Sequence, residues 1–129
     1  MEPLRRVLKT SFDEVLAKIP EALKSEGFGI LTEIDVKATL KKKIDVDFRP
    51  YRILGACNPP FAHQALSQNL EIGRMMPCNV VVYVDEAGDT VVSAVDPIQS
   101  MLVAGETPEL RALAAQVREK LGKALALLA

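Results

Sequence analysis

The sequence predicts a single α+β domain with the element order β-α-β-α-β-α-β-β-α, in which helices pack on an antiparallel or mixed sheet. The strongest observation is a hairpin pattern, since the β-branched run at residues 80–84 and the strand pattern at residues 90–95 flank the turn residues 85–89. Long helical patterns are also present. They do not alternate regularly with strands, which argues against a doubly wound parallel sheet.

Length and composition indicate one globular domain. The chain has 129 residues, of which 49% are hydrophobic and 26% are charged, and its formal net charge is -1. A domain of this length buries roughly two-thirds of the surface that its unfolded chain exposes. The near-neutral charge and the absence of Trp leave neither an electrostatic footprint for nucleic acid nor good stacking platforms for single strands. We expect no nucleic-acid partner.

Neither a signal-peptide core nor a membrane-spanning run is present in the sequence. We therefore expect a soluble, cytoplasmic protein that has no membrane partner. In a reducing compartment, two cysteines are expected to be free thiols, ligands or buried small residues rather than a structural disulfide.

Local signals define the first half of the chain. Residues 4–8 suggest a short opening strand, and the Ser11-x-x-Glu14 capping box begins a helix that Gly27 is placed to end. Pro20 lies inside this helix and is predicted to kink it. Alternation over residues 28–34 predicts the second strand.

Capping residues mark two further helices. Asp35 can cap a short helix that ends in a lysine run at residues 41–43, which is expected to be a solvated helix end rather than an anion site. Residues 51–57 form the third predicted strand, in which Gly55 is either a bulge or a point of close backbone approach. Asn58 and Pro59 then form an N-cap and first helical position, and Gly73 ends that region.

The C-terminal helix follows a less regular segment that runs through Gly105. Thr107 is its predicted N-cap, and Pro108 occupies the first helical position. Its apolar residues share one face. They are Leu110, Leu113, Ala114, Val117, Leu121, Leu125 and Leu128.

Cys57, His63 and Cys78 are the candidate functional residues. Cys57 lies at a strand-to-helix junction, where the helix dipole and free N-H groups would lower the thiol pKa, although a cysteine that ends an apolar strand is more often simply packed. His63 follows one to two helical turns later and would provide a base or a second metal ligand. Cys78 becomes a third ligand only where the two cysteine-bearing strand ends meet.

The same region of the sequence contains further candidate ligands, which are two methionines and three arginines. Met75 and Met76 are potential soft ligands or core filler, and Arg49, Arg52 and Arg74 are potential anion ligands or solvated side chains. The sequence contains no Ser-His-Asp arrangement, no phosphate loop and no dinucleotide glycine fingerprint, so it names no cofactor. A binding module is therefore favoured over an enzyme.

Three segments carry a family resemblance when taken as an ordered set. They are residues 29–37, residues 54–59 and residues 77–83, and a strand end at Asp96-Pro97 follows them. From about residue 4 to about residue 103, the chain resembles the widespread prokaryotic domain-of-unknown-function family 302. The resemblance implies a single α+β domain that is often dimeric, and it implies no activity.

The family pattern maps onto the two cysteine segments, at Cys57 and Cys78. Met76 departs from it, since many relatives carry Leu before Pro-Cys, and this departure weakens any special role for that methionine. Three functions are consistent with the sequence. The first is a small dimeric module that binds a metal or small ligand near Cys57, His63 and Cys78. The second is a thiol-dependent enzyme or redox protein that uses Cys57, and the third is a structural or interaction domain with inert buried thiols.

A homodimer is the expected assembly. The run at residues 80–84 lacks polar alternation, which is typical of a strand that is buried on both faces. Two long helices, however, cover only one face of a five-stranded sheet. A second subunit would supply the other layer. Of the two thiols, Cys57 is predicted to be the more reactive and to titrate below an ordinary cysteine, because Cys78 enters a buried strand.

Overall fold

Five antiparallel strands form one sheet in the order β1-β5-β4-β3-β2. The computed structural model describes residues 3–129. The strands are β1 (Arg5–Leu8), β2 (Gly29–Asp35), β3 (Tyr51–Cys57), β4 (Cys78–Val84) and β5 (Thr90–Ala94). The predicted hairpin is confirmed as β4 and β5, which pair from Val80 with Ala94 to Val84 with Thr90.

Helices connect and cover these strands. They are α1 (Phe12–Lys24), α2 (Val36–Ile44), α3 (Pro59–Gln68), α4 (Pro97–Met101) and α5 (Pro108–Ala126), with two short 3-10 helices, η1 (Leu70–Met75) and η2 (Leu102–Ala104). The predicted α+β class and the order of the predicted elements are confirmed. The segment expected to be irregular contains α4, because Pro97 occupies its first turn and the Asp96 carboxylate accepts a bond from the Ile98 N-H at 2.9 Å.

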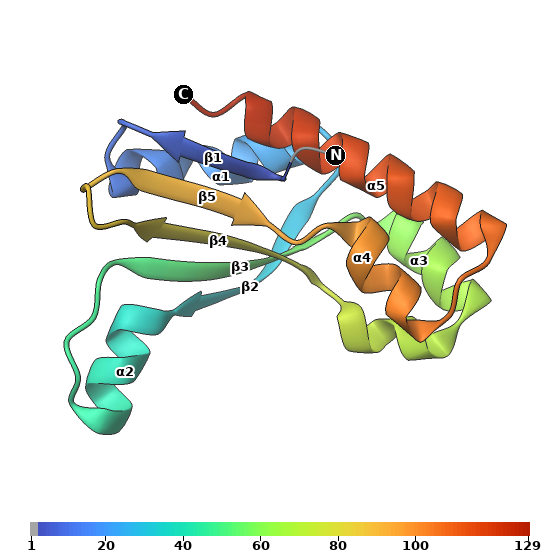
Figure 1. Cartoon of the computed structure of the whole chain (residues 1–129), viewed down its shortest axis with the longest axis horizontal. Coiled ribbons are helices and arrows are strands. Elements are labelled where there is room, and N and C mark those ends of the chain that lie inside the picture. The colour runs from blue at the N-terminus through green and yellow to red at the C-terminus, as the bar shows by residue number, and fades with distance from the viewer. Residues whose placement is uncertain (1–2) are drawn as a thin grey trace.

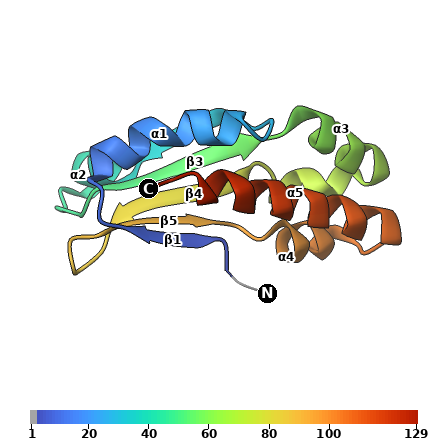
Figure 2. The same ribbon diagram turned by 90° about the horizontal axis from the view of Figure 1, so that it is seen from above.

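The helices are distributed unequally over the two faces of the sheet. Figure 1 shows α1 and α5 on one face, with α2 projecting on the opposite side at one end. Seen from above in Figure 2, α1 and α5 run along the sheet, and α3 and α4 lie beyond its other end. No described helix is both long and apolar enough to span a membrane.

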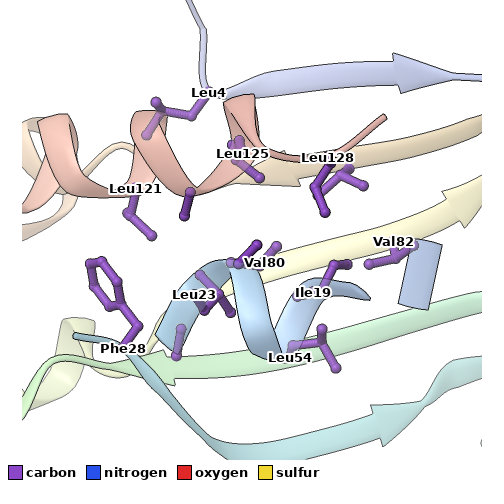
Figure 3. Close-up of a cluster of buried hydrophobic side chains, with 14 of the residues drawn as sticks. Leu4, Ile19, Leu23, Phe28, Leu54, Val80, Val82, Leu121, Leu125 and Leu128 are labelled. Atoms are coloured by element: carbon purple, nitrogen blue, oxygen red, sulfur yellow. The ribbon is translucent and has the colours of Figure 1, made fainter. Parts of the chain in front are cut away.

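Two clusters of buried side chains make the core. The larger lies between the sheet, α1 and the C-terminal part of α5, where Leu23, Leu54, Val80 and Leu121 meet (Figure 3). The smaller joins α3, η1, α4 and the start of α5. Every residue of the apolar face predicted for the last helix is buried, and that helix contributes to both clusters.

Caps form much as the sequence predicts. The Ser11 hydroxyl accepts a bond from the Glu14 N-H at 3.3 Å, and the Thr107 hydroxyl accepts one from the Leu110 N-H at 3.1 Å. Gly27 has a φ of 86°, the left-handed conformation predicted for it after α1. The helix continues through Pro20, which is exposed and has no N-H group to pair with the carbonyl of the preceding turn.

Gly55 is a point of close approach, which is one of the two alternatives that the sequence left open. A Cβ atom placed there would collide with the Thr32 hydroxyl and lie 2.7 Å from Cγ of Pro77. The irregularity itself lies on the neighbouring strand, where the register shifts between Ile30 and Thr32. Only a residue without a side chain fits between these two neighbours.

We therefore predict that Gly55→Ala lowers the free energy of unfolding by about 1–3 kcal/mol, because overpacking forces the backbone or Pro77 to move. Gly29→Ala is the matched control, since nothing lies within 4 Å of the Cβ added in β2. Urea denaturation of the two variants measures the difference. Equal midpoints for both variants would contradict the close approach.

Candidate functional site

The pairing of β3 with β4 brings the two cysteines to the same end of the sheet. The strands are antiparallel, and Ala56 is the direct partner of Cys78. Cys57 is the last residue of β3, and Cys78 is the first residue of β4. Both are free thiols. A parallel arrangement would have placed them at opposite ends, so the antiparallel pairing is what makes a joint site geometrically available.

Cys57 and Cys78 both line one cavity of about 30 Å³. It lies where the two buried clusters meet, and its wall comes from the ends of β3 and β4 together with α3, α4 and α5. The lining is almost wholly apolar. It consists of Phe28, Ala56, Cys57, Asn58, Phe61, Ala62, Ala65, Met76, Pro77, Cys78, Met101 and Val117.

Four of the lining residues contain sulfur. Met76 and Met101 join Cys57 and Cys78 on the cavity wall, whereas Met75 does not line it. Met76 packs against the smaller buried cluster, and Met101 belongs to it with only 7% of its surface exposed. The sequence pointed to the cysteines and to Met76. It gave no signal for Met101, which lies in the segment without a clear pattern.

The thiols do not have the electrostatic environment predicted from the sequence. Burial raises the pKa of Cys57, and burial followed by the neighbouring Cys57 raises the pKa of Cys78 to about 11. The prediction that Cys57 titrates below an ordinary cysteine is therefore wrong. Cys78 is the more deeply buried of the two, in agreement with the desolvation expected for it.

The start of α3 explains this outcome for Cys57. Pro59 and Pro60 occupy the first two helical positions, and neither has an N-H group to donate to a thiolate. Asn58 stands at the N-cap position but makes no capping bond there, contrary to the prediction, because its amide Nδ2 donates to the Glu26 carbonyl at 3.2 Å. The start of α3 therefore offers little stabilisation to a thiolate, and desolvation determines the direction in which the pKa of Cys57 shifts.

His63 is not brought to the thiols. Phe61, Ala62 and Ala65 form the α3 side of the cavity, while His63 is exposed and does not line it. Within residues 3–129, no group of three or more His, Cys, Asp or Glu side chains is arranged to hold a metal. The structure therefore joins two of the three predicted candidates, Cys57 and Cys78, and leaves out the third.

The arginine candidates are engaged elsewhere. Arg52 lies toward the other end of β3, where it pairs with Glu33 and, at 3.2 Å, with Asp35. Arg74 contacts Glu71 within η1 and is largely exposed. Arg49 pairs with Glu86 at 2.9 Å. None of the three lines the cavity, so no cation faces the thiols from this set.

Lys41 confirms the solvated character expected of the lysine run. Its ammonium group pairs with Asp45 at 2.9 Å and with Asp47 at 3.2 Å, and these acidic partners are themselves largely exposed. Exposed pairs of this kind contribute little to stability. The run closes α2 on its C-terminal side, where cations complement the helix dipole.

The chain is thus a small α+β protein with a largely apolar cavity, lined by both cysteines, at one end of an antiparallel sheet. The model of the family described as "Domain of unknown function DUF302" matches residues 4–128, so the chain belongs to the DUF302 family. The family match extends through the last helix, beyond the region that carried the sequence resemblance.

A solved structure agrees with this assignment. The chain is similar to an uncharacterized conserved DUF302 protein from Bacillus stearothermophilus, at 32% sequence identity and a TM-score of 0.86, over 95% of this chain and 94% of that one. The comparison with curated proteins finds no match. Family membership thus fixes the fold and leaves the activity to be argued from the site.

We predict that iodoacetamide labels Cys57 faster than Cys78 at every pH, and that both label more slowly than cysteines of the unfolded chain. The thiolate is the reactive form, and burial raises both thiol pKa values, for Cys78 to about 11. The native protein is labelled between about pH 7 and about pH 10, and mass spectrometry reads the extent of labelling for each cysteine. This measurement checks which thiol reacts first. Faster labelling of Cys78 would overturn it.

Proposed function

We propose that this DUF302 protein is a small dimeric binding module that holds one ion-sized ligand between Cys57 and Cys78. The observation that supports the proposal is the antiparallel pairing of β3 with β4, which puts both thiols on one cavity wall. The remainder of that wall is nearly all apolar, so the sulfur atoms are the groups that give the cavity its chemistry.

The size of the cavity selects the class of ligand. A volume of about 30 Å³ exceeds the roughly 10–15 Å³ that one water needs and falls far below the roughly 300–1,000 Å³ of drug-sized ligand pockets. A single ion fits this volume, so we propose that the ligand is an ion.

The thiol-dependent enzyme is the less favoured alternative. A nucleophilic cysteine needs a thiolate, whereas burial raises the pKa of both thiols. A general base is also missing from the cavity wall, because His63 is exposed and lies off it. The apolar surroundings suit a thiol that ionises only when it gains a ligand.

The second part of the proposal is the dimer. Side chains of the sheet alternate, so β1 to β4 each place apolar side chains on the face opposite α1 and α5. We call these side chains the open sheet face: Val7 and Ile34, which are exposed, and Tyr51, Ile53, Val81 and Tyr83, which are half-buried. Val91 lies on the same side of β5 but is fully buried. The Tyr51 and Tyr83 rings stack on it at a centroid distance of 5.2 Å.

A second copy of the chain is the occupant that fits this face. Apolar surfaces that contain aromatic residues are typical of protein interfaces, and a two-fold dimer pairs one such face with itself. The net charge of -1 makes repulsion between copies weak. The helix α2 has no buried residue, and exposed Ile44, Val46 and Phe48 lie at its end and in the loop that follows. A partner subunit would cover them.

We predict that Ile34→Glu converts the dimer to a monomer, because it places an unpaired charge within the buried interface. Ile34 is 48% exposed in the single chain, so the change costs the monomer little. Leu70→Glu is the matched control, since Leu70 is 82% exposed and lies on η1, away from the open sheet face.

Light scattering at micromolar concentration measures the assembly. The expected result is twice the 14.1 kDa chain mass for the wild type and for Leu70→Glu, and the chain mass alone for Ile34→Glu. A wild-type protein of 14.1 kDa would refute the dimer and leave the ion site untouched.

We predict that one soft ion per chain binds with an affinity that rises with pH, by about tenfold per pH unit for each thiol that loses its proton. Among the described residues, the two cysteines are the only titratable groups on the cavity wall, and their raised pKa values, about 11 for Cys78, extend this dependence above neutral pH. Titration with Cd(II), followed through thiolate absorption from pH 6 to pH 9, measures it.

Variants separate this proposal from its alternatives. Cys57→Ser and Cys78→Ser should each abolish stoichiometric binding, whereas His63→Ala should bind as the wild type does, because His63 does not line the cavity. Absence of binding together with rapid alkylation of Cys57 would favour the thiol enzyme. Absence of binding together with slow alkylation of both cysteines would favour a structural domain with inert thiols.

A further inference from the structure

The cavity offers sulfur in two chemical forms. Cys57 and Cys78 provide thiol groups, and Met76 and Met101 provide thioethers, all four on one wall. Thiolate and thioether ligands suit soft metals, which are Cu(I), Zn(II) and the iron of iron–sulfur clusters, whereas carboxylate ligands suit harder ions. Asn58 is the one other polar side chain on the wall, and its amide nitrogen already donates to the Glu26 carbonyl.

The cavity lacks what a zinc site requires. Structural zinc is held by four ligands drawn from Cys, His, Asp and Glu. Among residues 3–129, no three such side chains are grouped for a metal, and the cavity wall contributes just the two cysteines from that set. Only the methionines can complete a ligand set of sulfur atoms, and their preference is for soft, monovalent ions.

We propose that the ligand is Cu(I), bound by the sulfur atoms of Cys57 and Cys78 and completed by the thioethers of Met76 and Met101. This inference rests on the proposed ion-binding function and names its ion. Binding is a ligand exchange without electron transfer: each thiol that becomes a ligand forms a sulfur–copper bond and releases its proton to solvent.

Charge limits which further ligands the site can add. Among the described residues, the cavity wall carries no cation, and a charge left uncompensated in an apolar site is costly. Two thiolates bound to Cu(I) leave one net negative charge, and the thioethers complete the ligand set without adding to it. A site that gains ligands without gaining charge suits this apolar wall, where burial already opposes ionisation of both cysteines.

The alternative role for the two methionines is filling space in the smaller buried cluster. Leu substitution tests this directly, because an exchange of Met for Leu conserves volume and usually costs less than about 1.5 kcal/mol of stability. Met75 offers a control in the same stretch of chain, since it neighbours Met76 without lining the cavity.

The experiment titrates the full-length reduced protein with Cu(I), under nitrogen, against a chromophoric Cu(I) chelator, and titrates the same protein with Zn(II) and Cd(II). The expected result is one Cu(I) per chain and a preference for Cu(I) over Zn(II). Met76→Leu and Met101→Leu should each weaken Cu(I) binding by about tenfold or more, equal to about 1.4 kcal/mol, with Cd(II) binding unchanged. Met75→Leu should match the wild type.

The outcomes separate this inference from the function on which it rests. If no soft ion binds in a cysteine-dependent manner, the ion-binding function itself fails. If Cd(II) binds through the cysteines while Met76→Leu and Met101→Leu keep wild-type Cu(I) affinity, the binding function stands and the copper inference is overturned. A copper-edge absorption spectrum with nitrogen or oxygen ligands would overturn it as well.

Discussion

The register between β3 and β4 is the constraint on which the rest of the molecule depends. At one end it pairs Ala56 with Cys78 and so places both thiols beside one cavity, and at the other it pairs Tyr51 with Tyr83 on the open sheet face. A slip of one residue would exchange the two faces of a strand. The same hydrogen bonds therefore define the candidate ion site and the proposed interface.

The last helix holds the two buried clusters together. Leu110, Leu113 and Ala114 belong to the smaller cluster, and Val117 and Leu121 continue the same face into the larger. The cavity lies where the clusters meet, and Val117 forms part of its wall. Neighbouring turns of α5 therefore pack against different partners on the two sides of the cavity.

The sequence predicts features that local chemistry determines. The caps of α1 and α5, the hairpin and the apolar face of α5 depend on residues close together in the chain, and the structure confirms them. Features that depend on contacts between distant residues were harder to predict. Met101 lines the cavity because α4 packs beside it, and no periodic pattern in the sequence indicates that packing. The prediction of a lowered pKa for Cys57 was wrong because it assumed free N-H groups at the start of α3. Pro59 and Pro60 occupy those positions and have no N-H groups.

The cost of keeping the cavity is small. At about 24 cal/mol per Å³, an empty volume of 30 Å³ costs about 0.7 kcal/mol, a minor part of the stability of a domain. Its apolar wall also keeps both thiols protonated, since burial raises both pKa values. An empty site is then neutral and poorly nucleophilic, and the arriving ion itself creates the thiolates that bind it. An apolar wall thus protects the thiols from reaction while leaving them able to bind a soft cation.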